Sequence, residues 1–156
     1  MPLPDASAVP ASYEWRDDVH ALPGGLDLHF GGRVEPVEVA YRLAGVRGAP
    51  VVAVLGGISA GRNVFSLNCA APGWWEDAIG PGRALDTDRF RVLGIDFLGG
   101  SHRSTGPAKG EIFPSISAFD QAKLLLALMD LLGVERLQAS LGASYGGMVT
   151  LALAQA

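Results

Sequence analysis

The sequence predicts an α/β fold built on a mainly parallel sheet, and three observations point to it. The segment PVVAVLGG is apolar without interruption, and FRVLGIDFLGG repeats the pattern about 40 residues later. A strand that is apolar on both sides is typical of a parallel sheet, which is covered on both faces. Strand-like and helix-like segments then alternate along the chain, which is the order that a parallel sheet requires.

Length and charge limit what the chain can be. Its 156 residues, 49% of them hydrophobic, suffice for one buried core. The formal net charge is -4 and there is no run of lysine or arginine, so we expect no nucleic-acid partner. No apolar run approaches the roughly 20 residues that cross a bilayer, so we expect no membrane partner either.

The start of the chain predicts a cytoplasmic protein, because it lacks the basic stretch and apolar run that direct secretion. The single cysteine, Cys69, cannot form an intramolecular disulfide. We expect its side chain to act as a small buried hydrophobe rather than as a second nucleophile.

Residues 1–22 are rich in Pro, Ala, Ser and Asp without periodicity, so we expect an irregular N-terminal arm there. Over residues 26–30 and 37–41, apolar residues alternate with others, the pattern of two half-buried antiparallel strands. The sequence FGGR supplies the turn between them. The sheet is therefore expected to begin with an antiparallel hairpin, followed by the apolar strand of PVVAVLGG.

The segment 117–132 has the best helical pattern in the chain. Ser117, followed three residues later by Asp120, predicts a capping box at its start, and Gly133 predicts its end. RLQASLG then predicts a third core strand, and YGGMVTLALAQA predicts a second helix.

Between that strand and that helix lies GASYG, a G-x-S-x-G sequence with Ser144 at its centre. In this context it predicts a nucleophile elbow, a strained turn that presents the serine hydroxyl at the edge of the sheet. Gly142 and Gly146 are expected where side chains would collide with the neighbouring strand and helix. The backbone N–H of Tyr145, at the start of the helix, is then a donor for an oxyanion.

A second oxyanion donor is expected in the glycine-rich loop LGGISAGRN, and the backbone N–H of Ile58 is our candidate. Two other interpretations of this loop stay open, a phosphate-binding loop and a purely structural turn. Neither G-x-x-x-x-G-K-[ST] nor G-x-G-x-x-G occurs in it, which disfavours the phosphate-binding loop.

Three segments carry a family resemblance: GWWEDAIGPGRALDTDRFRVLGIDFLGGSHRSTGP, the elbow GASYGGM, and the hairpin LDLHFGGRVEPVEVAYRLAG. They resemble the homoserine O-acyltransferases of the α/β-hydrolase fold, which acylate homoserine from acetyl-CoA or succinyl-CoA in methionine biosynthesis. The resemblance covers most of positions 26–156. It implies that residues 23–156 are the N-terminal part of an α/β-hydrolase domain, truncated after the nucleophile elbow.

The resemblance also implies a mechanism. Ser144 would attack the thioester of acetyl-CoA or succinyl-CoA, the N–H groups of Ile58 and Tyr145 would hold the oxyanion, and the acyl group would pass from the serine to homoserine. Acyl-CoA would be a co-substrate, with no bound cofactor and no metal ion. The partners would be small-molecule substrates and, in the complete enzyme, a second copy in a homodimer.

The remaining triad residues are expected outside this chain. In α/β-hydrolases the acid and the histidine follow the serine, yet His20, His29 and His102 all precede Ser144. We therefore expect the N-terminal portion of a longer enzyme, inactive alone and paired with its C-terminal portion. Two alternatives stay open: an esterase or thioesterase with water as acceptor, and a catalytically incomplete fragment with an interaction role.

Overall fold

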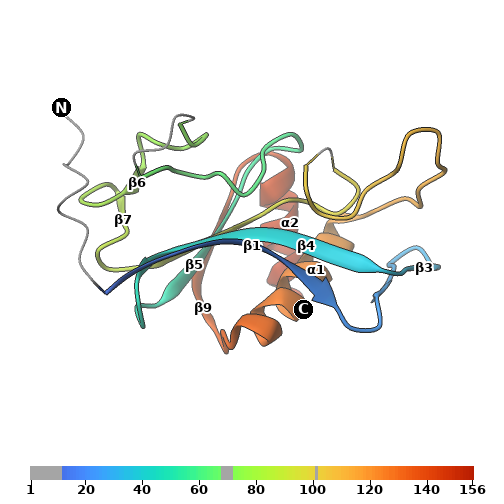
Figure 1. Ribbon diagram of the computed structural model, residues 1–156, viewed down its shortest axis with the longest axis horizontal. Helices are drawn as coiled ribbons and strands as arrows, with labels where there is room; N and C mark the ends of the chain where they lie inside the picture. Colours follow the sequence, from blue (N-terminus) through green and yellow to red (C-terminus); the bar gives the residue numbers. More distant parts are fainter. Residues whose placement is uncertain (1–11, 68–71, 101) are drawn as a thin grey trace.

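The structure is a computed structural model that describes residues 12–67, 72–100 and 102–156, so Cys69 lies outside the described residues. In chain order the strands are β1 (Tyr13–Leu22), β2 (Leu26–Asp27), β3 (Arg33–Val34), β4 (Val37–Val46), β5 (Val51–Leu55), β6 (Ile79–Gly80), β7 (Leu85–Asp86), β8 (Arg91–Ile95) and β9 (Leu137–Gly142), and the helices are α1 (Ala118–Leu132) and α2 (Tyr145–Leu153). Five strands form the main sheet, in the order β1-β4-β8-β5-β9 (Figure 1).

The sheet is mixed, with its parallel part where the sequence predicts it. β5 pairs in parallel with β8 on one side and with β9 on the other. β4 pairs antiparallel with both β1 and β8. Because β5, β8 and β9 run in the same direction, their carboxyl ends meet at one edge of the sheet, and the loops that follow them converge there.

The prediction of an irregular arm is wrong for residues 13–22. These ten residues form β1, which pairs with β4 along its whole length, from Tyr13 opposite Val46 to Leu22 opposite Val37. The strand lacks an apolar alternation because it lies at the edge of the sheet and carries charged side chains, such as Asp17, which pairs with Arg42. Its ladder of backbone hydrogen bonds with β4 holds it in place.

The predicted hairpin over 26–41 is also partly wrong. The FGGR turn is present, closed by hydrogen bonds from Leu28 N to Gly32 O and from Gly31 N to Leu28 O, but it joins only the two-residue strands β2 and β3. The long strand β4 pairs with β1 instead, because a ten-residue ladder outweighs a two-residue one. Phe30, which the alternation places inside, is 72% exposed.

Both faces of β5 are buried, which confirms the expectation from its uninterrupted apolar sequence. Val51, Ala53 and Leu55 belong to the core on the helix side, together with Leu124 and Leu128 of α1 and Val149 of α2. The alternate residues Val52 and Val54 face a second core, built from the segment after β5 and including Phe65 and Ile79. The strand therefore lies at the centre of a three-layered unit.

The two helices pack against each other on one side of the sheet (Figure 1). α1 begins and ends as predicted. Ser117 and Asp120 form a complete capping box, and Gly133 ends the helix in the left-handed region with φ 66°. Within the described residues, no helix is both long and apolar enough to cross a membrane.

Candidate active site

Three loops meet at the carboxyl ends of the parallel strands. The first follows β5 and contains Ile58, the second follows β8 from Asp96 onward, and the third is the turn from β9 into α2 that contains Ser144. Ligand and catalytic sites in open α/β sheets lie at this edge. The sequence-predicted nucleophile and its predicted oxyanion donors are thus brought to one place.

Ser144 has an unusual backbone conformation, with φ 54° and ψ -121°. It is the one non-glycine residue with positive φ in the part of the chain that the structure describes. Such strain is found where the surroundings force it, most often at functional sites. Ser144 precedes the first residue of α2, but its side chain makes no capping hydrogen bond, and the residue is exposed. Its hydroxyl therefore remains free for chemistry.

The two elbow glycines are required sterically. A Cβ atom on Gly142 would lie 2.2 Å from the carbonyl oxygen of Gly146. A Cβ atom on Gly146 would lie 2.2 Å from the carbonyl oxygen of Leu55 and 2.6 Å from that of Gly56. All three contacts are with backbone atoms that cannot turn aside, so only glycine fits at both positions.

Hydrogen bonds join the elbow directly to the end of β5. Ala143 N donates to Leu55 O at 3.0 Å, and Gly146 N donates to Gly56 O at 2.8 Å. The next residue, Gly57, comes so close that a Cβ atom on it would lie 4.0 Å from the Cβ atom of Ser144. The loop that contains Ile58, the predicted second oxyanion donor, therefore begins beside Ser144.

The two candidate donors have free N–H groups. Ile58 is the second residue of a turn that Ala60 N closes on Gly57 O at 2.9 Å, a position whose own N–H the turn does not use. Tyr145 N belongs to the first turn of α2, which has no acceptor within the helix. Among the described residues, neither N–H has a hydrogen-bond partner. The arrangement is chemically suited to an oxyanion beside Ser144.

The side chain of Tyr145 packs inward. Its ring lies edge-to-face on Phe97, with centroids 5.0 Å apart, and burial raises the pKa of its phenol. Tyr145 thus anchors the elbow through its side chain, while its backbone N–H stays available.

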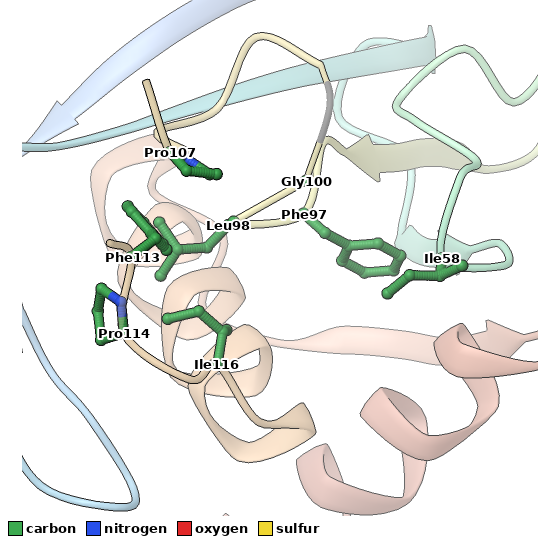
Figure 2. Close-up of a pocket in the computed structure, with 9 residues that line it drawn as sticks. Ile58, Phe97, Leu98, Gly100, Pro107, Phe113, Pro114 and Ile116 are labelled. Atoms are coloured by element: carbon green, nitrogen blue, oxygen red, sulfur yellow. The ribbon is translucent and has the colours of Figure 1, made fainter. Parts of the chain in front are cut away.

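An apolar pocket of about 290 Å³ lies beside this edge. Figure 2 shows Ile58 and Phe97 pointing toward each other on one side, with Phe113 and Ile116 on the other. The remaining lining residues are equally uncharged: Leu98, Gly99, Gly100, Pro107 and Pro114. Because Ile58 and Phe97 also belong to the surroundings of the elbow, the pocket is suited to an apolar part of a substrate.

None of the three histidines is placed by a contact against Ser144. His20 lies on β1, at the opposite edge of the sheet from β9, and stacks on Tyr41. His29 stacks on Phe119, at the start of α1. His102 lies at the same edge as the elbow, where its Nε2 donates to Ser59 O at 2.9 Å. In the described part of the chain, no three His, Cys, Asp or Glu side chains cluster as metal ligands would.

Sequence reasoning missed Asp96, which is fully buried at the end of β8 and binds the loop that contains Ile58. The signal is present in FRVLGIDFLGG, where one carboxylate interrupts a long apolar run. A charge in such a run is buried only when it is paired.

Comparisons with known proteins agree with this geometry. A family described as alpha/beta hydrolase fold matches residues 50–156. A homoserine O-acetyltransferase from Clavibacter michiganensis subsp. michiganensis is 38% identical, with 91% of this chain and 42% of that protein covered. A serine O-succinyltransferase from Frateuria aurantia is 36% identical, with 85% and 40% covered. The chain spans about 40% of the length of these curated relatives.

Solved structures show the same relationship. A homoserine O-acetyltransferase from Bacillus anthracis, known from its crystal structure, is 25% identical with a TM-score of 0.78. The match covers 90% of this chain and 43% of that protein's chain. The crystal structure of esterase E22 is also 25% identical, with a TM-score of 0.75, and covers 87% and 42%. An acyltransferase and an esterase thus share the fold of this chain.

Proposed function

The chain belongs to the alpha/beta hydrolase fold family, and on that premise we propose that it carries the nucleophile of an acyl-CoA-dependent O-acyltransferase. One observation supports this most strongly: Ser144 is held in a strained conformation with its hydroxyl uncapped and exposed. A serine that served only to begin a helix would adopt an extended backbone and cap the helix with its side chain.

The reaction begins with attack of Ser144 Oγ on the thioester carbonyl of the donor. The carbonyl oxygen becomes an oxyanion that the N–H groups of Ile58 and Tyr145 stabilise. The C–S bond then breaks, the thiol of CoA leaves with the proton taken from Ser144, and an acyl-serine remains. In the second half, the hydroxyl of the acceptor attacks this ester and regenerates the free serine.

The general base is the part that we assign outside these 156 residues. The serine hydroxyl is a weak nucleophile near neutral pH and needs an adjacent base. His20 and His29 are packed elsewhere, and His102 donates to a backbone carbonyl. We therefore assign the triad Asp and His to a segment beyond this sequence, which accords with the 42% coverage of the first relative.

Exposed surface supports a place for that segment. Among the described residues β9 pairs only with β5, so its other edge is free. Met148 and Leu151 of α2 are 62% and 68% exposed, respectively. We propose that a C-terminal portion covers this edge, and that the complete enzyme forms a homodimer.

For the substrates, the relatives support an acyl group and the hydroxyl of an amino acid. We propose homoserine as the acceptor and acetyl-CoA or succinyl-CoA as the donor, in the cytoplasm and in methionine biosynthesis. The second candidate is an esterase or thioesterase, which the similarity to esterase E22 favours. A catalytically incomplete fragment with an interaction role is the third.

Release of free thiol from each acyl-CoA, measured with and without homoserine, separates these functions. We expect the protein joined to its C-terminal portion to release one equivalent of thiol on acylation of Ser144, and to release thiol in repeated turnovers only when homoserine is present. Repeated turnover at the same rate in its absence would identify a hydrolase. Intact-mass spectrometry after incubation with acyl-CoA alone should show one acyl adduct on Ser144, and its absence with both donors would contradict acyl transfer.

A further inference from the structure

The carboxylate of Asp96 joins the loop after β8 to the loop after β5. It is fully buried. Its Oδ1 accepts a hydrogen bond from Arg62 N at 2.8 Å, and its Oδ2 accepts one from Arg103 N at 3.0 Å. The guanidinium of Arg62 adds a third bond to Oδ2 at 2.8 Å. The buried charge is therefore both paired and hydrogen-bonded, which is the condition for tolerating it.

The same loop is held at further points around Asp96. His102, which follows β8, donates from Nε2 to Ser59 O at 2.9 Å. The indole of Trp74 donates to Gly61 O at 2.8 Å. A Cβ atom on Gly61 would lie 2.5 Å from Asp96 Oδ1, so the loop backbone is packed directly against the carboxylate. Residues 59, 61 and 62 are thus fixed by groups outside the loop.

A chain of charges extends this support to the far edge of the sheet. Arg62 Nε donates to Asp17 Oδ1 of β1 at 2.8 Å, and Asp17 also pairs with Arg42 of β4. Burial alone would raise the pKa of Asp17, but the hydrogen bonds from Arg62 and Arg42 outweigh it and lower the pKa. Arg62 is therefore held from two sides.

These contacts bear on Ile58, which lies in the turn that ends at Ala60, between the elbow and the anchored residues. An oxyanion donor is effective only at hydrogen-bond distance from the oxygen as its charge develops, and a shift of about 1 Å costs on the order of a hundredfold in rate. No bond inside the turn fixes the Ile58 N–H itself. Its direction follows from where residues 59–62 are held.

We propose that Asp96 is a positioning residue whose carboxylate holds the loop after β5 so that the Ile58 N–H points at the oxyanion. The inference rests on Ser144 being the nucleophile. The carboxylate is needed because all three of its partners are donors, and an amide offers an acceptor on one side only. Asp96→Asn sets an NH2 group against at least one of these donors.

The test compares Asp96→Asn with a matched change, Asp120→Asn. Asp120 is equally buried and also accepts two backbone hydrogen bonds, from His29 N at 2.7 Å and Ser117 N at 2.8 Å, but these lie at the start of α1. Both variants lose a buried carboxylate, so both should lower the midpoint of thermal unfolding. Only Asp96→Asn should slow the chemistry at Ser144.

The measurement is the acylation burst with p-nitrophenyl acetate at 25 °C, in the protein joined to its C-terminal portion. For Asp96→Asn we expect the saturating burst rate to fall by about 10- to 100-fold with KM within about twofold. For Asp120→Asn we expect the rate to stay within about threefold. Equal losses in both variants, or a loss confined to KM, would overturn the positioning role.

A second variant decides the matter if Asp96→Asn does not fold. His102→Phe removes only the bond to Ser59 O, from an exposed side chain, and should slow the burst by about 3- to 10-fold. An unchanged burst in His102→Phe would then overturn the proposal. The ester also separates the two claims: a burst with the ester but none with acyl-CoA refutes acyl transfer from CoA and leaves the role of Asp96 standing.

Discussion

Ser117 and Ser144 each stand directly before the first residue of a helix, but only Ser117 caps it. Ser117 has an extended backbone, with φ -99° and ψ 168°, and its side chain accepts a hydrogen bond from Asp120 N. The Asp120 carboxylate accepts one in return from Ser117 N at 2.8 Å. Ser144 has φ 54°, and its side chain makes no capping hydrogen bond with the N–H groups of α2.

The difference shows what a nucleophile elbow costs. An N-cap serine contributes about 1 kcal/mol to stability, and a strained backbone of this kind costs on the order of 1 to 3 kcal/mol. The turn at Ser144 lacks the stabilisation of an N-cap side chain and also carries the free-energy cost of the strained backbone. The close contacts of Gly142 and Gly146 and the two hydrogen bonds to β5 compensate for the loss.

The largest effect that tests this comparison is on activity. Ser144→Ala removes the nucleophile, and acyl transfer in the complete protein should fall by about 10⁴-fold or more. Unfolding in urea should change little, since alanine bears the same backbone strain. Ser117→Ala is the control and should leave acyl transfer unchanged. An acyl adduct persisting by mass spectrometry in Ser144→Ala would remove this serine from the mechanism.

The second effect is on the packing that compensates for the strain. Gly146→Val places a branched side chain against Leu55 O and Gly56 O, and we expect a loss of at least about 3 kcal/mol in the free energy of unfolding, with loss of activity. Gly147→Ala is the control, since a Cβ atom there meets its nearest neighbour at an ordinary 3.5 Å. Denaturant titration measures both. A Gly146→Val variant as stable as the parent would show that the elbow is an ordinary loop.

The third effect is on the capped helix. Ser117→Ala should lower the free energy of unfolding by about 1 kcal/mol, because the N–H of Asp120 loses its side-chain acceptor and keeps only its bond to Ser117 O at 3.1 Å. Asp120 keeps its bond from His29 N, so we expect α1 itself to persist. Urea titration followed by circular dichroism gives the value. No loss of stability would mean that water replaces this cap without cost.

The smallest effect is a gain in stability, whereas most substitutions lower the free energy of unfolding. Ser144→Gly should raise the free energy of unfolding by about 1 kcal/mol, because glycine adopts the positive φ without strain. Ser117→Gly, at an unstrained position, should lower it by a few tenths of a kcal/mol. The midpoints of thermal unfolding compare the two variants. A lower midpoint for Ser144→Gly would show that the elbow is not strained.

Local signals in the sequence predicted most of the elbow and of the central strands. The spacing around Ser144 specifies the turn, and the apolar run over 51–55 specifies a strand buried on both faces. The sequence did not predict β1, because this edge strand carries charged side chains and has no apolar periodicity. Its position is set by pairing with β4. The role of Asp96 was not predicted, because its hydrogen bond with Arg62 N joins residues 34 positions apart and no local sequence pattern encodes such a pairing.

The hydrogen bonds from Ala143 N to Leu55 O and from Gly146 N to Gly56 O join the turn around Ser144 to the start of the loop that contains Ile58. When thermal motion displaces β5, the serine and the loop drift together, and their mutual alignment survives. A general base from another segment therefore needs to be aligned only once, because Ser144 and the loop that contains Ile58 keep their positions relative to each other. Under the proposed function, the groups that activate the electrophile are therefore already aligned within this chain, and the group that transfers the proton is supplied by the C-terminal portion.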